Sequence, residues 1–117
     1  MKKEIISYLQ SQVEKHQAKY REAQGYIFEN FNENLADWGE RMWKAKFLMG
    51  CYEQEIEDVK HSHRLAIDQI KYDIDILSEF YLYPTMVRKD SANELANTIS
   101  TWKFECILQF INDLKSL

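Results

Sequence analysis

The chain has 117 residues, which is enough for one domain with a single core of modest size. It contains one proline and three glycines, so residues typical of turns are scarce and a few long helices are favoured over strands. The net charge of −4 argues against a general nucleic-acid-binding protein, whose domain would carry an excess of lysine and arginine.

The first predicted helix spans residues 3–31. Its apolar and small residues recur in steps of three and four, which places them on one face. This face consists of Ile6, Leu9, Val13, His16, Tyr20, Ala23, Ile27 and Phe31. Gly25 lies within the pattern and weakens the last turn and a half, since glycine is unfavourable in a helix interior.

The central segment, residues 35–80, keeps the same spacing over more than six heptads. Asn34 is a good N-cap, so a helix is expected to begin directly after it. The repeated face consists of Leu35, Trp38, Met42, Ala45, Met49, Tyr52, Ile56, Val59, His63, Ala66, Ile70, Leu77 and Phe80. Asp73 interrupts this series. A helix with such a stripe must be covered by other helices.

The last helix is predicted to follow a loop that contains Pro84. Ser91 and Glu94 have the spacing of a capping box, so the helix is expected to begin there. Its apolar positions form two rows, which are Leu95, Ile99, Trp102, Cys106, Phe110 and Leu114, and Phe104, Ile107, Leu108 and Ile111. A helix that is apolar over most of its circumference is normally buried on several sides.

The length of the central helix decides the architecture. An unbroken helix over residues 35–82 would be about 72 Å long, and the other two helices would leave most of it in a two-helix hairpin. Either the helix is continuous and pairs with a second copy, or it breaks near Gly50 and gives segments 3–31, 35–49, 52–82 and 91–117. We favour the continuous helix in a homodimer, because the heptad register passes through Gly50 undisturbed.

Both arrangements share one fold class. We predict an all-α protein with a single helical domain over residues 1–117. It is a bundle of three long helices, or four if the central helix breaks near Gly50, with antiparallel packing like that of a coiled coil. Cys51 and Cys106 are isolated thiols within helical patterns, which favours a reducing compartment over a disulfide framework. No segment resembles a signal peptide or a transmembrane helix, so we expect a cytoplasmic protein without membrane contact.

Residues with catalytic or metal-binding chemistry are few. Glu57, Asp58, His61 and His63 form one cluster of metal-ligand types. Metal-binding helical bundles use two inward-facing Glu-x-x-His motifs, whereas here aspartate replaces glutamate and no second motif exists. We therefore predict no catalytic residue, no cofactor and no metal ligand, and keep a metal-binding helical-bundle enzyme as a second alternative.

Two groups of aromatic residues are candidates for contact with a partner. Trp43 and Phe47 are four residues apart and lie beside the apolar stripe, and Tyr81 and Tyr83 belong to the loop near Pro84. Residues 53–79 contain eight acidic and three basic side chains, so this stretch is strongly acidic. The acidic residues of this stretch are Glu53, Glu55, Glu57, Asp58, Asp68, Asp73, Asp75 and Glu79. Such a surface would attract a basic partner and accelerate association.

These features favour a non-enzymatic protein that acts through a protein–protein interface. The most specific expectation is a small acidic inhibitor or immunity-type factor that neutralises a toxin, nuclease or defence enzyme in bacteria or phage. The alternative is a homo-oligomeric coiled-coil adaptor. His16 and His63 occupy core-type positions, so we also expect assembly to weaken below about pH 6.

Overall fold

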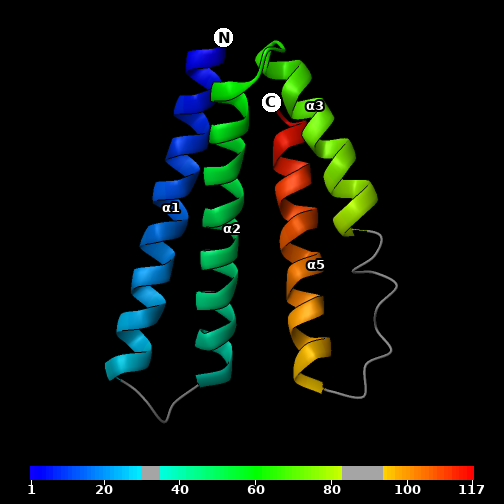
Figure 1. Ribbon diagram of the computed structural model, residues 1–117. Coiled ribbons are helices and arrows are strands. Elements are labelled where there is room, and N and C mark those ends of the chain that lie inside the picture. Colours follow the sequence, from blue (N-terminus) through cyan, green and yellow to red (C-terminus); the bar gives the residue numbers. More distant parts are fainter. Residues whose placement is uncertain (30–34, 83–93) are drawn as a thin grey trace.

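The computed structural model describes residues 1–29, 35–82 and 94–117 and is helical in each of these ranges. The elements are α1 (Lys2–Glu29), α2 (Leu35–His61), α3 (Ala66–Leu77), a π-helix η1 (Ser78–Leu82) and α5 (Glu94–Lys115). Successive helices run in opposite directions, so both termini lie at one end of the bundle (Figure 1). The predicted all-α bundle is confirmed. Within the described residues, no helix is long and apolar enough to span a membrane.

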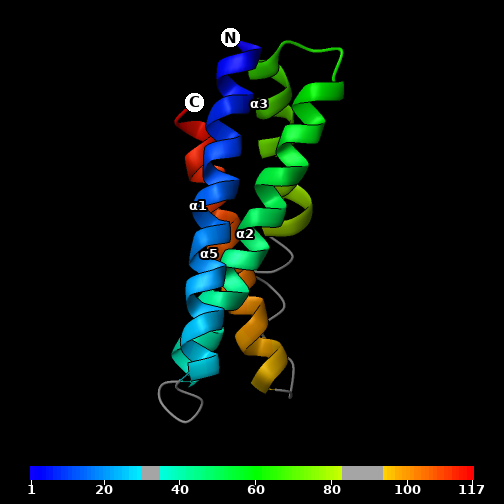
Figure 2. The ribbon, with the colours of Figure 1, turned by 90° about the vertical axis from the view of Figure 1, so that its left-hand side faces the viewer.

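Helix α1 and helix α2 form the most extensive pair in the bundle. They lie alongside each other over most of their lengths in both views (Figures 1 and 2). The face predicted for α1 is buried at Leu9, Val13, His16 and Ala23. The matching part of α2 is buried at Ala45, Met49, Tyr52, Ile56 and Val59. Heptad spacing therefore identified the middle of this packed face, whereas Leu35 at its end is exposed. Ile5 and Leu48, which the spacing left out, are buried.

The continuous central helix is not observed, and the longest extent of the molecule is 48 Å. Helix α2 ends at His61 and helix α3 begins at Ala66, so the break lies between these two residues. A break near Gly50 is also wrong, because Gly50 lies inside α2 on an exposed face. The molecule therefore does contain a fourth helical segment, but it begins at Ala66, fourteen residues after residue 52, where the alternative placed its start.

Side-chain hydrogen bonds hold the connection between α2 and α3. The Ser62 hydroxyl oxygen accepts a hydrogen bond from the Arg64 amide at 2.9 Å and donates to Gln69 Oε1 at 2.6 Å. The Arg64 guanidinium also donates to Gln69 Oε1, at 3.2 Å. Serine competes with helix continuation through such local bonds. Gln69 therefore ties the first turns of α3 to the end of α2.

Helix α5 packs against α2 on one side and against α3 on the other. Its buried residues are Cys106, Ile107, Phe110, Ile111 and Leu114. The Phe110 ring meets the Tyr52 ring edge to face, with 4.8 Å between ring centroids. The predicted dimer was needed to cover apolar rows of a two-helix hairpin. Since α3 covers α5 within the same chain, that geometric reason for a dimer no longer holds.

Three of the expected helix boundaries cannot be compared with the structure. The proposed N-cap Asn34, the loop proline Pro84 and the capping residue Ser91 lie outside the described residues.

Candidate functional site

Trp43 and Phe47 lie together on α2, in a hollow that opens between α2 and α5. Their rings stack with centroids 5.2 Å apart, and Trp102 of α5 lies 5.8 Å from Trp43. We name this hollow the aromatic groove. Its lining consists of Tyr20, Ala36, Gly39, Met42, Trp43, Lys46, Phe47, Leu95, Thr98 and Trp102, around a volume of about 730 Å³. Both predicted aromatic residues are half-buried, so each ring is partly available to a ligand.

A second hollow continues along α2 from the aromatic groove. The two share Lys46 and Phe47. We name it the acid cavity, which has a volume of about 550 Å³ and lies among α2, α3, η1 and α5. Its lining consists of Lys46, Phe47, Gly50, Cys51, Gln54, Glu55, Asp58, Asp73, Ile76, Leu77, Tyr81 and Phe110. Tyr81 is thus placed at the cavity rim, whereas Tyr83 lies outside the described residues.

The acid cavity holds three carboxyl groups from two helices. Glu55 and Asp58 come from α2 and Asp73 comes from α3, and one oxygen of each lies within 4.8 Å of the others. Glu55 is only 3 % exposed and Asp73 only 8 %. Glu55 and Asp73 therefore do not belong to the exposed acidic surface predicted from the sequence, because the packing of α3 on α2 covers them.

Burial changes the proton affinity of these carboxyl groups. Loss of solvent raises the pKa of Glu55 to about 10, and the neighbouring Asp73 and Asp58 add to this effect. The pKa of Asp58 is also raised, first by burial and then by Asp73 and Glu57, although a hydrogen bond from Gln54 opposes the rise. At neutral pH and without a bound cation, Glu55 is therefore protonated.

The cluster is only partly satisfied by hydrogen bonds. Gln69 Nε2 donates to Asp73 Oδ1 at 2.9 Å, and Gln54 Nε2 donates to Asp58 Oδ1 at 3.0 Å. Glu55 Oε2 and Asp73 Oδ2 are buried without a hydrogen-bond partner. Among the described residues, no lysine, arginine or histidine forms an ion pair with any of the three. Buried carboxyl groups without a counter-charge are costly to stability.

The remaining predicted acids do lie at the surface. The exposed members are Glu53, Glu57, Asp68, Asp75 and Glu79. His61 Nε2 lies 3.1 Å from Glu57 Oε2 in an exposed i,i+4 pair. His63 is exposed in the connection between α2 and α3. Its assignment to the buried face is therefore wrong, because the helix ends before it.

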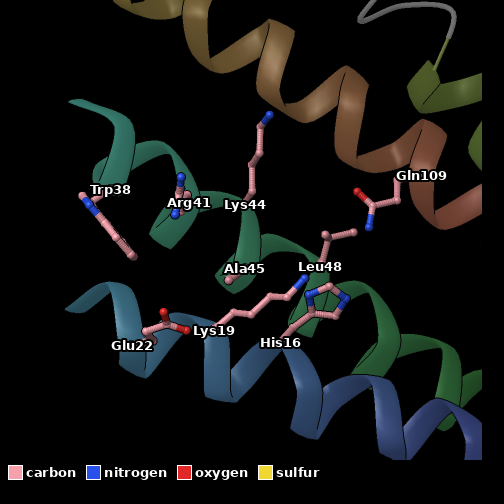
Figure 3. Close-up of a pocket in the computed structure, with 9 residues that line it drawn as sticks. All are labelled: His16, Lys19, Glu22, Trp38, Arg41, Lys44, Ala45, Leu48 and Gln109. Carbon is pink, nitrogen blue, oxygen red and sulfur yellow. The ribbon is translucent and has the colours of Figure 1, made fainter. Parts of the chain in front are cut away.

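A third hollow lies between α1 and α2, near α5, and is lined mainly by basic and polar residues (Figure 3). It has a volume of about 350 Å³ and is lined by His16, Lys19, Glu22, Trp38, Arg41, Lys44, Ala45, Leu48 and Gln109. An anion would be the natural ligand of such a lining. The charges are largely neutralised within the protein, however.

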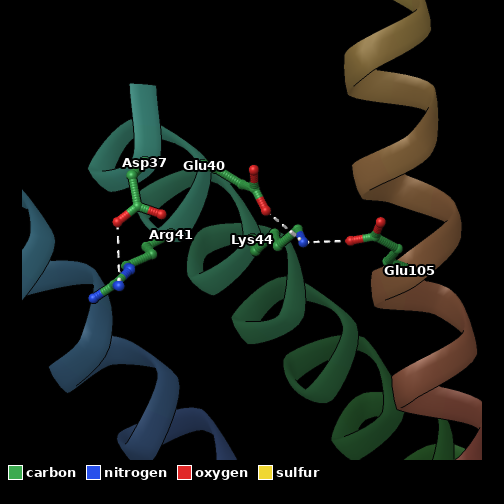
Figure 4. Close-up of polar contacts among 5 residues, drawn as sticks. All are labelled: Asp37, Glu40, Arg41, Lys44 and Glu105. Carbon is green, nitrogen blue, oxygen red and sulfur yellow. Dashed lines mark hydrogen bonds and ion pairs between the residues drawn. The ribbon is translucent and has the colours of Figure 1, made fainter. Parts of the chain in front are cut away.

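Figure 4 shows how the two cations contributed by α2 are paired. Arg41 lies 3.1 Å from Asp37, and Lys44 bridges Glu40 and Glu105. The Arg41 guanidinium also lies over the Trp38 ring, 4.5 Å from its centroid. Since both groups already have partners, this hollow is a weaker candidate for ligand binding than the acid cavity.

His16 at the base of this hollow is buried and stacks on Tyr52, with ring centroids 5.6 Å apart. Burial lowers its pKa to about 4, and Lys19 and Lys15 lower it further, against a smaller opposing effect of Asp113. Asp113 accepts hydrogen bonds from both Tyr8 and Tyr52, each at 2.5 Å. His16 is therefore neutral in the folded protein at neutral pH.

The sequence contained one sign of the acid cavity that the prediction did not use. Asp73 interrupts the apolar series at a position where the neighbouring turns are buried at Ile70 and half-buried at Leu77. An acid at such a position points to a buried carboxyl group that needs partners. Glu55 carried no comparable sign, because it lies beside the stripe in a stretch of alternating acids.

No protein-family model, curated protein or solved structure matches the chain significantly.

Proposed function

We propose that this protein is a non-enzymatic binding protein whose partner inserts an apolar helix into the aromatic groove. The observation that carries the proposal is the set of half-buried aromatic rings, Trp43, Phe47 and Trp102, beside a hollow of about 730 Å³. Aromatic residues in such pockets are the usual energetic centres of protein interfaces. Grooves between helices commonly accept one face of an amphipathic helix.

The exposed acids of α2, α3 and η1 support a partner with basic residues, whereas the charged side chain in the described lining of the groove itself is Lys46. Five exposed acids lie on α2, α3 and η1, which also border the adjoining acid cavity. Opposite charges at the rim of an interface mainly accelerate association and make it depend on salt. A small acidic protein with these properties suits an inhibitor or immunity-type factor that neutralises a toxin, nuclease or defence enzyme.

The setting that we propose is the cytoplasm of a bacterium or of a phage-infected cell. The two cysteines are free, with Cys106 buried and Cys51 half-buried, as is usual for a reducing compartment. Burial raises the pKa of Cys51 to about 12 and that of Cys106 to about 11, so neither thiol is primed as a nucleophile.

The test uses one charge at the rim of the groove. Leu95 is 65 % exposed in the first turn of α5, so Leu95→Asp adds a charge without disturbing the core. Affinity capture with the wild-type protein should recover one partner in a simple ratio. We expect Leu95→Asp to lower the amount of this partner that is recovered by at least tenfold. Phe28→Ala is the matched control, since Phe28 is an 88 % exposed apolar residue on α1, and it should retain the partner.

Two further measurements separate the alternatives. Binding to the captured partner should weaken as ionic strength rises, and co-production should suppress the activity of that partner. Light scattering coupled to gel filtration reports the mass of the purified protein. A dimer that dissociates in Leu95→Asp, together with no captured partner, would instead support a homo-oligomeric adaptor.

A further inference from the structure

We propose that the acid cavity is a binding site for a divalent cation that prefers oxygen ligands, with Ca²⁺ as the best fit. Glu55, Asp58 and Asp73 would supply the protein ligands, and water in the open cavity would complete the coordination shell. This proposal goes beyond the interaction with a protein partner and does not depend on it.

The spacing of the carboxylate oxygens fits one ion. Their nearest oxygens all lie within 4.8 Å of one another. Any two ligands of one Ca²⁺ are at most about 4.6–5.2 Å apart, so oxygens this close together can share a single ion. Ca²⁺ tolerates irregular and flexible geometry, whereas Mg²⁺ needs a nearly ideal octahedron. We therefore expect Ca²⁺ to bind more tightly than Mg²⁺.

The second observation is the state of the buried oxygens. Glu55 Oε2 and Asp73 Oδ2 have no hydrogen-bond partner, although both residues are more than nine-tenths buried and line the cavity. The third carboxyl group, Asp58, has an oxygen within 4.8 Å of an oxygen of each of the other two residues. Together, the three carboxylates bring up to three negative charges, which a divalent cation would largely neutralise.

The donor atoms exclude softer metals from the proposal. All three candidate ligands are carboxylate oxygens, which suit Ca²⁺, Mg²⁺ and Mn²⁺. Cys51 also lines the cavity, but its sulfur is not among the ligand atoms that lie within 4.8 Å of one another. The predicted cluster around His61 and His63 differs from this one, since both histidines are exposed.

The rigid base of the site comes from the break between α2 and α3. Gln69 is held by Ser62 and Arg64 and donates to Asp73 Oδ1. Gln54 likewise donates to Asp58 Oδ1. Hydrogen bonds of this kind orient carboxylate ligands and leave their other oxygens for a metal ion. The π-helix η1 borders the same cavity through Tyr81, and π-helical turns are frequent at functional sites.

The experiment titrates the full chain, freed of metal with a chelator, with CaCl₂ in an isothermal calorimeter. We expect one Ca²⁺ per chain and the release of protons, which two buffers of different ionisation enthalpy would reveal. MnCl₂ offers a second probe, because its paramagnetism should broaden the NMR signals of residues around the cavity. MgCl₂ should bind more weakly than CaCl₂.

Matched variants decide where the ion binds. Glu55→Gln and Asp73→Asn keep the shape of the side chain, and each should weaken Ca²⁺ binding by about tenfold or more. Glu53→Gln and Asp68→Asn remove exposed acids from the same two helices and should leave binding unchanged. Saturation with Ca²⁺ should also raise the melting temperature of the wild-type protein. The melting temperatures of the two cavity variants should not rise.

Three results would overturn the proposal. The first is the absence of Ca²⁺ or Mn²⁺ binding, which would mean that protons alone neutralise the cavity. The second is binding that survives in both cavity variants. The third is an equal loss in Glu53→Gln, which would indicate weak attraction to surface acids. Failure of the cation site would leave the proposed protein interface untouched, since Leu95→Asp tests that interface separately.

Discussion

The two sides of α2 bury different kinds of side chain. Towards α1, the contact is nearly all apolar, and its one buried polar residue, His16, is a neutral ring stacked on Tyr52. Towards α3, the contact holds Glu55, Gln69 and Asp73, which are the other buried polar residues within the described ranges. Apolar contact stabilises the bundle, whereas buried carboxyl groups reduce its stability.

This difference separates two roles within one small fold. The α1–α2 pair provides most of the stable packing, and the hollows that border α3, η1 and α5 provide space for a ligand or partner. Sites that bind ligands often retain groups that are unfavourable for folding. Substitutions on the two sides of α2 should therefore differ in size and, for the carboxyl groups, in sign.

The largest effect is expected in the apolar half. Leu9 of α1 is fully buried, so Leu9→Ala should lower the free energy of unfolding by about 3 kcal/mol through lost burial and a residual cavity. Urea denaturation followed by circular dichroism measures this loss. Leu95→Ala is the control, and it should change stability by no more than about 0.5 kcal/mol because Leu95 is exposed. Equal losses in both variants would contradict the comparison.

His16 should make the same half sensitive to acid. Its folded pKa of about 4 lies below the ordinary value of 6.5, so folding disfavours its protonation. The stability that neutral His16 contributes is present above pH 6.5 and is lost as the pH falls towards 4, by about 2–3 kcal/mol.

His16→Gln should remove this part of the acid loss, as measured by urea denaturation at several pH values. The charged groups that act on His16 are Lys15, Lys19 and Asp113, and they remain in the variant. His63→Gln should behave like wild type, since His63 is exposed. Identical acid profiles for wild type and His16→Gln would sink this explanation.

The acidic half should show the opposite dependence on pH. Folding raises the pKa of Glu55 to about 10, so the folded protein holds a proton that the unfolded chain loses above about pH 4.5. Without a bound cation, stability should therefore decline as the pH rises from 4.5 towards 10.

Glu55→Gln should flatten this decline and raise the free energy of unfolding by about 2 kcal/mol at pH 8 in the presence of a chelator. Glu53→Gln provides the exposed control and should leave the slope as in wild type. A destabilised Glu55→Gln would show that the carboxyl group contributes to the folded state in a way that an amide cannot replace.

The smallest effects concern two glycines in exposed helix positions. A methyl group added at Gly25 or at Gly50 would meet no atom within 4 Å. Each change to alanine should therefore stabilise its helix by about 0.5–1 kcal/mol, which thermal unfolding can measure. Gly50 lines the acid cavity and Gly25 does not, so a gain at Gly25 alone would indicate that the cavity wall needs the smaller residue.

The apolar periodicity was sufficient to predict the helices and the main packed face. Residues such as Leu9, Val13, Tyr52 and Val59 are buried as expected, because side chains three and four positions apart share one side of a helix. These features depend on neighbours within one or two turns, which a local pattern can report. The aromatic residues Trp43 and Phe47, predicted as an exposed contact pair, are half-buried against the core.

The helix break and the buried acids depend on contacts between distant parts of the chain. The heptad spacing runs from Val59 through His63 to Ala66 without a change, so periodicity does not distinguish a straight helix from two helices that fold back. The hydrogen bond from Ser62 to Gln69 links the end of α2 to α3 and can form only when α3 has folded back. The same turn brings Asp73 next to Glu55. The two residues are eighteen positions apart in the sequence, and the packing of α3 on α2 places their carboxylate oxygens within 4.8 Å of each other.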